Sequence, residues 1–132
     1  AAEFLVRLRP NKNRRAYPMI SLALDTSTLT ACGNDIGFDN IFSRNLSALG
    51  DKKDLLIAIS TSGNSKNIIS ALKEAKKMKI FSIALLGSKG GNAKKYTDLN
   101  LIVPSNNVAR IQEAHIFLGH YILEKVEDLL IK

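Results

Sequence analysis

One stretch of the chain constrains the fold more than any other, because a short apolar run leads directly into a loop rich in hydroxyl groups. Residues 55–59 are all apolar, and residues 60–65 read Ser-Thr-Ser-Gly-Asn-Ser. Apolar residues then recur at helical spacing over residues 66–78. An unbroken apolar run bounded by turn residues is typical of a strand covered on both faces. The sequence therefore predicts a buried strand, a loop and a helix, in that order.

The loop at residues 60–65 has the composition of a phosphate-binding site. A helix N-terminus carries free backbone N–H groups and a partial positive charge, so it attracts anions. Ser60, Thr61, Ser62 and Ser65 add short hydroxyl donors around the same point. The ordinary alternative is a helix N-cap, which needs only one hydroxyl group. The loop lacks the lysine of nucleotide triphosphate-binding loops, so the sequence favours a sugar phosphate as the ligand.

The composition fits one globular domain, residues 1–132, with a single core. The only cysteine, Cys32, excludes an internal disulfide and indicates a reducing compartment. No apolar run approaches the roughly 18 residues of a membrane-spanning helix, so no membrane partner is expected. The net charge of +7 comes from scattered basic residues without interleaved aromatic residues. This distribution argues against a nucleic acid partner and favours anionic substrates.

Apolar strands alternate with helical segments along the chain, which predicts an α/β fold. The expected architecture is a three-layer α/β/α sandwich around a parallel sheet. Besides the strand that precedes the loop, we expect strands at residues 19–24, 81–86 and 99–103. Helices are expected at residues 1–9, 26–31, 41–49, 66–78 and 108–130, and residues 33–35 are expected to form a turn. Ligands of such sheets bind at the carboxyl ends of the strands, where the 60–65 loop would lie.

The last predicted helix carries more apolar residues than one buried face requires. Its predicted inner stripe is Ile111, His115, Leu118, Ile122, Val126 and Leu129, with His115 as a packing residue. Further apolar residues, Ile116, Phe117, Tyr121 and Leu123, lie outside this stripe. A helix that is apolar around much of its circumference needs a second covering surface, which would be either N-terminal helices that precede Ala1 or another subunit. We predict a homo-oligomer.

Residues 1–9 read as a helix that begins without a capping residue, so we expect an N-terminal part of the polypeptide to precede Ala1. Several short motifs then resemble the phosphoheptose isomerases, a family of enzymes with a sugar isomerase (SIS) domain. The residues that carry the resemblance are Ala2-Glu3, residues 33–38, residues 59–65, residues 109–113, His115 and His120. The 60–65 loop marks the wider group of SIS domains, whereas Glu3 together with residues 110–113 and His120 is more specific.

The resemblance implies a role for individual residues of this chain. It implies that Ser60, Thr61, Ser62 and Ser65 bind the substrate phosphate and that Asn34, Asp35 and Gln112 contact the substrate. It also implies that Glu3 and His120 are catalytic, and that Glu3, Gln112 and His120 are ligands of one zinc ion per subunit. A further zinc-ligating histidine, a first strand and a glycine-rich loop of the family would precede Ala1.

The family resemblance further implies a cytoplasmic tetramer. Members of the phosphoheptose isomerase family interconvert sedoheptulose 7-phosphate and glycero-manno-heptose 7-phosphate, an early step toward ADP-heptose and the lipopolysaccharide core. Such an aldose–ketose isomerisation needs a base near carbon and an acid or electrophile near oxygen. Glu3 would be the base, and His120 would be the acid or only a metal ligand.

Two observations qualify this assignment. Gln112 and His120 are eight residues apart, or roughly 12 Å along a helix, so one of them is expected to serve the site of a neighbouring subunit. Related SIS-domain proteins also act without catalysis, as phosphosugar-binding proteins, as adaptors of replication initiation that lack the catalytic glutamate, or as regulators. The presence of both Glu3 and His120 favours the enzyme over the adaptor.

Overall fold

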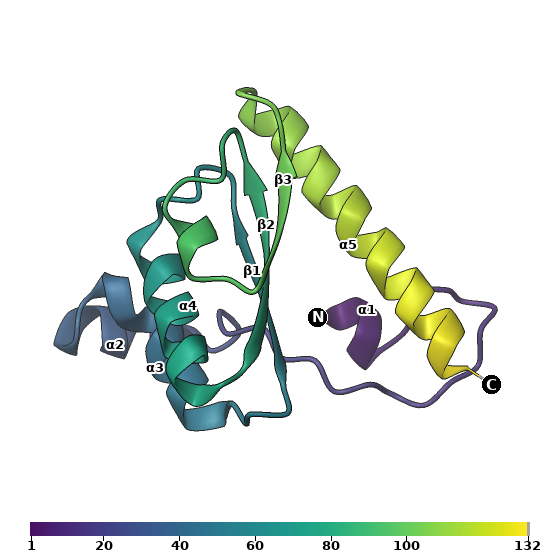
Figure 1. Ribbon diagram of the computed structural model, residues 1–132. Helices are drawn as coiled ribbons and strands as arrows, with labels where there is room; N and C mark the ends of the chain where they lie inside the picture. The colour runs from purple at the N-terminus through teal and green to yellow at the C-terminus, as the bar shows by residue number, and fades with distance from the viewer. Residues whose placement is uncertain (132) are drawn as a thin grey trace.

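The computed structural model describes residues 1–131 and has an α/β fold around a parallel sheet of three strands (Figure 1). The strands are β1 (Leu55–Ser60), β2 (Phe81–Gly87) and β3 (Leu99–Val103), and they lie in the order β1-β2-β3. Leu55 pairs with Phe81 at one end of the first pair of strands, and Ser60 pairs with Leu86 at the other. The parallel register brings the carboxyl ends of the strands to one edge, as the sequence predicts.

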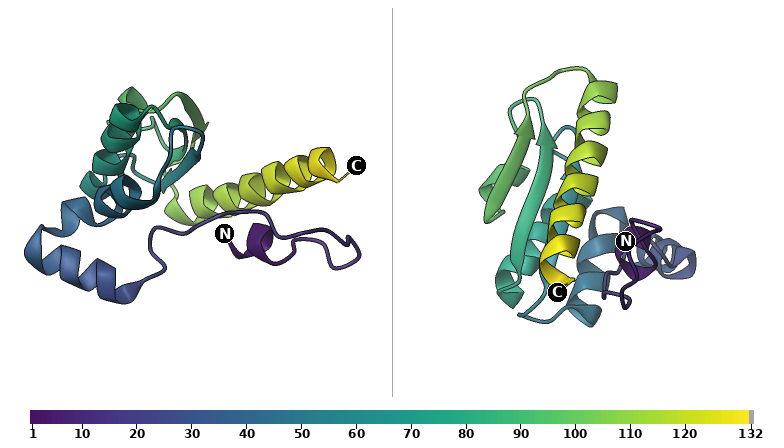
Figure 2. Two further views of the ribbon diagram at one scale, coloured as in Figure 1. Left: turned by 90° about the horizontal axis from the view of Figure 1, so that it is seen from below. Right: turned by 90° about the vertical axis from the view of Figure 1, so that its right-hand side faces the viewer.

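Helices cover both faces of the sheet. On one face lie α3 (Ile41–Leu49) and α4 (Lys66–Met78), and on the other lies α5 (Val108–Leu130) (Figure 2). The core between α4 and the sheet is formed by Ala58, Leu72, Ala84, Leu86 and Ala93. The three-layer prediction is therefore confirmed. The predicted helices at 41–49, 66–78 and 108–130 have the observed bounds.

The remaining elements are additions to this sandwich. They are α1 (Ala2–Leu5), α2 (Thr26–Asp35) and two single turns of 3-10 helix, η1 (Phe38–Asn40) and η2 (Ala93–Lys95). One of them, η2, contributes Ala93 to the core of the sandwich. Asp25 caps α2 by accepting hydrogen bonds from the backbone N–H groups of Ser27 and Thr28. Gly37, with a φ of +104°, then turns the chain away from α2. In the described residues, no helix is both long enough and apolar enough to span a membrane.

Three predictions about these elements are wrong. Residues 19–24 form no strand. The backbone N–H of Leu24 donates to the Ser21 carbonyl at 3.2 Å, and Asn45 of α3 donates to the Leu22 carbonyl at 2.9 Å. The first helix ends at Leu5 rather than near Arg9. The second helix continues through Asp35, so the glycine at its expected end lies inside the helix. In each case a tertiary contact or a later capping turn overrides the local pattern.

The inner stripe of α5 is only partly as predicted. Ile111 and His115 are buried, whereas Leu129 is 77% exposed. The unpredicted buried residue of this helix is Glu127, whose side chain is fully buried although it carries a carboxylate. A buried carboxylate requires charged or hydrogen-bonding partners.

Two arginines near the N-terminus supply those partners. Arg9 donates from Nε to Glu127 at 2.6 Å and from Nη2 to Asp128 at 2.6 Å. Arg14 donates from Nε to the other Glu127 oxygen. Residues more than 110 positions apart are thereby joined, and this ion cluster fastens the N-terminal segment to the C-terminal half of α5. We call it the Glu127 clasp, and it consists of Arg9, Arg14, Glu127 and Asp128.

Arg14 also holds α1 in place. Its guanidinium group donates to the backbone carbonyls of Glu3 and Phe4 at 2.7 and 3.0 Å. The same group lies 5.8 Å from the ring centre of Phe4 and 4.5 Å from that of Tyr17. Carbonyl groups at the end of a helix lack intrahelical partners. The short helix that carries Glu3 therefore depends on Arg14 for its position.

Replacing Arg14 with methionine should strongly destabilise the protein. The substitution leaves Glu127 buried with one partner fewer and removes the Arg14 bonds to the Glu3 and Phe4 carbonyls, so we expect the thermal midpoint to fall by about 10 °C. Arg15→Met, at the exposed neighbouring position, is the matched control and should change the midpoint little. Calorimetry measures both, and equal midpoints for the two variants would contradict a stabilising clasp.

The clasp should also make stability depend on pH on the acid side. The hydrogen bond from Arg14 is the largest cause of a lowered pKa for Glu127, and Arg9 adds to it, whereas burial opposes both. A carboxyl group with a lowered pKa stabilises the fold above its unfolded pKa of about 4.3. That stability is lost as the pH falls through the lower pKa of the folded state. Chemical denaturation between pH 7 and pH 3 should show a shallower acid loss in Glu127→Gln than in the wild type, and identical slopes would contradict this assignment.

Candidate functional site

The hydroxyl-rich loop leaves the sheet at the carboxyl end of β1 and enters α4. Ser60 is the last residue of the strand, and Lys66 is the first residue of the helix. The local sequence produces this turn because Gly63 adopts a φ of +65°, a conformation that other residues rarely adopt. The loop thus presents its hydroxyl groups together with the first backbone N–H groups of α4, which have no partner within the helix.

The structure bears on the choice between an ordinary helix cap and an anion site. Ser65 is the N-cap of α4 but makes no side-chain capping hydrogen bond. In contrast, Asp25 and Asn107 cap α2 and α5 with their side chains. The Ser65 hydroxyl instead lies 3.3 Å from the Ser60 hydroxyl. The cap interpretation therefore does not account for Ser65, whose hydroxyl group is paired with that of Ser60 rather than with the backbone of α4.

Backbone groups of the loop set the orientation of two further hydroxyls. The N–H of Gly63 donates to Oγ of Ser60 at 3.1 Å, and the N–H of Asn64 donates to Oγ of Ser62 at 3.1 Å. An oxygen that accepts a hydrogen bond from its own loop still has its hydrogen to donate elsewhere. The loop can therefore offer several hydroxyl donors to one anion.

A pocket of about 550 Å³ connects this loop with α5. Its lining is formed by Ile59, Ser60, Thr61 and Ser65 from the β1 end and by Gln112, His115 and Ile116 from α5. We call it the Gln112 pocket. Its volume is in the range that small-molecule ligands occupy. The structure thus brings four predicted site residues together: Ser60, Thr61, Ser65 and Gln112.

His115 is a pocket residue that the sequence interpretation treated only as a packing residue. It is buried, and its Nε2 lies 3.0 Å from the Leu86 carbonyl. Because a carbonyl oxygen only accepts, Nε2 carries the proton of this hydrogen bond. Nδ1 has no hydrogen-bond partner in the described residues. The signal was present in the sequence, since His115 follows Gln112 by three residues and such residues share a helix face.

The other predicted site residues do not line the Gln112 pocket. Asn34 and Asp35 lie in the last turn of α2, where the Asn34 amide donates to the Asp35 carboxylate at 2.7 Å. Figures 1 and 2 show α2 beyond α3, on the opposite side of the sheet from α5. Glu3 lies in α1, and Ser62 and His120 are exposed. A single chain therefore presents the predicted site in separate parts.

The predicted zinc ligands do not all line the Gln112 pocket. In the part of the chain that the structure describes, no group of three or more histidine, cysteine, aspartate or glutamate side chains could hold a metal ion. Of the predicted ligands Glu3, Gln112 and His120, only Gln112 lines the pocket. These residues do not fit a zinc ion without a further contribution, and we derive no chemical step from the metal.

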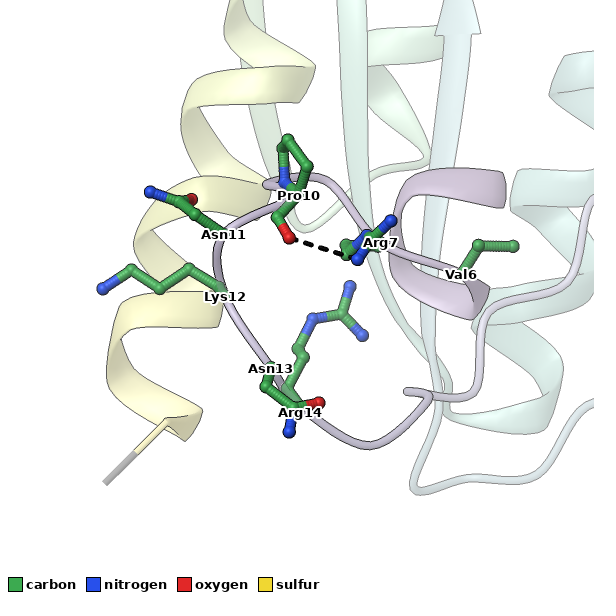
Figure 3. A pocket seen from close by; sticks show the side chains of 7 residues that line it. All are labelled: Val6, Arg7, Pro10, Asn11, Lys12, Asn13 and Arg14. Atoms are coloured by element: carbon green, nitrogen blue, oxygen red, sulfur yellow. Dashed lines mark hydrogen bonds between the residues drawn. The ribbon is translucent and has the colours of Figure 1, made fainter.

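A second hollow lies in the loop after α1 and has no predicted site residue in its lining (Figure 3). Its volume is about 370 Å³, and it is lined by Val6, Arg7, Pro10, Asn11, Lys12, Asn13 and Arg14. Arg7 donates to the Pro10 carbonyl at 3.1 Å, and Arg14 belongs to the Glu127 clasp. The hollow is therefore a feature of the clasp rather than a second candidate site.

With this geometry established, comparison with known proteins defines the class. The family model of the SIS domain matches residues 1–87. The chain belongs to the SIS domain family. Its relatives within that family are phosphoheptose isomerases, as the motifs at residues 59–65 and 109–113 predict.

The relatives are similar over almost the whole chain. The phosphoheptose isomerase of Chlorobaculum parvum is 48% identical over 131 residues, which cover 98% of this chain and 63% of the relative. That of Clostridium acetobutylicum is 50% identical over 130 residues, which cover 98% of this chain and 65% of the relative. The chain therefore spans slightly less than two thirds of the length of these proteins.

Solved structures of phosphoheptose isomerases are also similar to this chain. Phosphoheptose isomerase GmhA from Neisseria gonorrhoeae is 46% identical with a TM-score of 0.80, over 81% of this chain and 61% of that protein. A phosphoheptose isomerase from Francisella tularensis is 41% identical with a TM-score of 0.84, over 92% of this chain and 64% of that protein. The sandwich around β1 to β3 is thus shared with the part of these enzymes that the chain covers.

The 60–65 loop should bind phosphate through its hydroxyl groups. Ser65→Ala and Ser62→Ala each remove one donor to a charged ligand, so each should weaken binding of inorganic phosphate about fivefold to tenfold. Ser47→Ala, at an exposed position of α3, is the control and should leave the affinity unchanged. Isothermal titration measures the three variants. Unchanged affinity in the Ser62/Ser65 double variant would mean that the loop does not bind the anion through these groups.

Proposed function

We propose that this protein is a phosphoheptose isomerase that interconverts sedoheptulose 7-phosphate and glycero-manno-heptose 7-phosphate. The observation that carries the proposal is the Gln112 pocket, in which hydroxyl groups of the 60–65 loop lie opposite an amide side chain of α5. The names of the relatives support the same reaction. The loop would hold the phosphate, and Gln112 would contact the sugar chain.

The proposed reaction moves a proton between two adjacent carbons through an enediol. Starting from the ketose, Glu3 takes a proton from C1 while an acid, His120, donates a proton to the carbonyl oxygen on C2. The enediol then receives a proton at C2, and the hydroxyl on C1 loses its proton to become the aldehyde. No electron acceptor is needed, because one carbon is oxidised as its neighbour is reduced. Holding the distant phosphate orients the reacting carbons.

This assignment requires more than one copy of the chain. Glu3 and His120 do not line the pocket of their own chain, so the proposed site combines residues from neighbouring subunits. The outer face of α5 supports such an interface: Ile116 is 62% exposed, Phe117 67% and Tyr121 51%. Exposed apolar patches of this kind commonly mark protein–protein contacts. We therefore propose a homo-oligomer, with a tetramer as the expected state.

Further properties follow from the family resemblance alone and belong to the same proposal. They are one zinc ion per subunit, a cytoplasmic location and a place in the synthesis of ADP-heptose for lipopolysaccharide. Zinc would act as a Lewis acid when bound, and its ligands would have to come from an assembled oligomer. The alternative of a non-catalytic phosphosugar-binding or adaptor protein has less support, because the named relatives are isomerases and Glu3 and His120 are both present.

Mixing two inactive variants tests the reaction and the shared site together. The full-length wild type should convert sedoheptulose 7-phosphate to the aldose, and Glu3→Gln and His120→Gln should each lose at least 100-fold in kcat, on the order of a general acid–base contribution. If each site takes Glu3 and His120 from different subunits, then mixed oligomers of the two variants should regain part of the activity.

The outcomes separate the hypothesis of isomerase activity from the hypothesis of a site shared between subunits. Conversion by the wild type without recovery in the mixture would mean that each site takes Glu3 and His120 from the same subunit, and it would remove the proposed division of these two residues between subunits. A folded wild type that forms no aldose product would contradict the isomerase itself. Sedimentation of the same samples gives the oligomeric state, and a fully active monomer would exclude the interface at α5.

A further inference from the structure

Two glycine-containing turns from different parts of the chain touch each other beside the proposed phosphate site. Gly63 lies in the 60–65 loop, whereas Gly90 and Gly91 follow β2, and all three have positive φ values of 65°, 84° and 56°. A Cβ atom on Gly63 would lie 2.1 Å from the Gly90 carbonyl oxygen, and one on Gly91 would lie 2.4 Å from the Ser62 carbonyl oxygen. Only glycine allows the two backbones to approach this closely.

Hydrogen bonds join the same two turns. The N–H of Ala93 donates to the Gly63 carbonyl at 2.8 Å. The N–H of Asn92 donates to Oδ1 of Asn64 at 3.0 Å, and Nδ2 of Asn64 donates to the Ser62 carbonyl at 3.2 Å. The Asn64 side chain therefore connects the turn after β2 with the backbone of the loop.

These contacts fix the hydroxyl group of Ser62 as well. The N–H of Asn64 donates to Oγ of Ser62 at 3.1 Å, so the main chain and side chain of Asn64 together hold the hydroxyl and carbonyl groups of the serine. A binding group that is held before the ligand arrives loses less freedom on binding. Asn64 thus orients the hydroxyl group of Ser62, a hydrogen-bond donor that belongs to another residue.

We propose that Asn64 is a positioning residue for phosphate binding and that residues 90–92 act as its brace. The brace holds the 60–65 loop in the conformation in which Ser62 and Ser65 donate to the same phosphate group. This inference rests on the proposed phosphate site, but it concerns a residue and a turn outside the lining of the Gln112 pocket. It predicts that phosphate affinity depends on the contact between the 60–65 loop and the turn at residues 90–92.

Three variants test the brace. Asn64→Ala removes both side-chain bonds, Asn64→Asp keeps an acceptor for the Asn92 N–H but loses the amide donor, and Gly91→Ala forces the two turns apart. The controls are Asn11→Ala, an exposed asparagine, and Gly33→Ala, where a Cβ would meet nothing within 4 Å. Inorganic phosphate is the probe, and its Kd and the exchange rate of the Asn92 amide hydrogen are measured on each folded variant.

We expect Asn64→Ala and Gly91→Ala to raise the Kd for phosphate about tenfold and to speed exchange at Asn92, whereas the controls change neither. Asn64→Asp should also bind phosphate more weakly, because its charge repels the anion, but it should keep the Asn92 amide protected. In the isomerase assay, Asn64→Ala should raise KM for the sugar phosphate with little change in kcat. If Asn64 were needed only for folding, Asn64→Ala would not raise KM while leaving kcat unchanged. Nor would Asn64→Asp weaken phosphate binding while the Asn92 amide stays protected from exchange.

Three results would overturn the inference. If the wild type binds phosphate and Asn64→Ala binds it equally well, then the brace is wrong while the proposed site stands. If Asn92 exchange is the same in Asn64→Ala and wild type, then the bond between the turns does not hold the loop in solution. A folded wild type that binds no phosphate would refute the proposed phosphate site and the brace together, and only that result removes both.

Discussion

The parallel pairing of β1 and β2 is the constraint on which the rest of the site depends. Because Ser60 lies beside Leu86, both strands end at the same edge and release their loops side by side. The loop after β1 then meets the turn after β2 at Gly63 and Gly91. A shift of this register by one residue would turn Ser60 to the other face of the sheet and separate the two loops. The position of the hydroxyl groups in the 60–65 loop thus depends on the backbone pairing of β1 with β2.

Much of this arrangement could be predicted from local patterns. The apolar run before Ser60 and the periodicity over 66–78 predict β1 and α4, because strands buried on both faces and amphipathic helices have distinct periods. The same reasoning places the hydroxyl groups at a helix N-terminus. It cannot place Gln112 opposite them, because that contact depends on how α5 crosses the sheet. Gln112 is predicted as a site residue only from the family resemblance, and the fold shows that it lines the same pocket as Ser65.

The failures have physical causes that local patterns do not contain. Residues 19–24 are apolar enough for a strand, but they pair with no neighbouring strand, and the Leu22 carbonyl accepts from the side chain of Asn45 instead. Glu127 looks like a surface residue of an amphipathic helix, and only the arrival of Arg9 and Arg14 from a distant segment makes its burial tolerable. His115 was assigned to packing, which its bond to the Leu86 carbonyl supports, yet its ring also lines the pocket. Contacts between distant segments decide all three.

The Glu127 clasp has a consequence for how the protein is made. Arg14 leaves the ribosome 113 residues before Glu127, the carboxylate that neutralises it. Until then, α1 lacks the arrangement that caps its carbonyl groups, and Arg14 has no buried counterion. Closing so long a loop is costly in chain entropy and is a late event in folding. We therefore expect the segment that carries Glu3 to acquire its final position only after α5 has formed, so that the proposed catalytic base is fastened to the sandwich in a late step of folding.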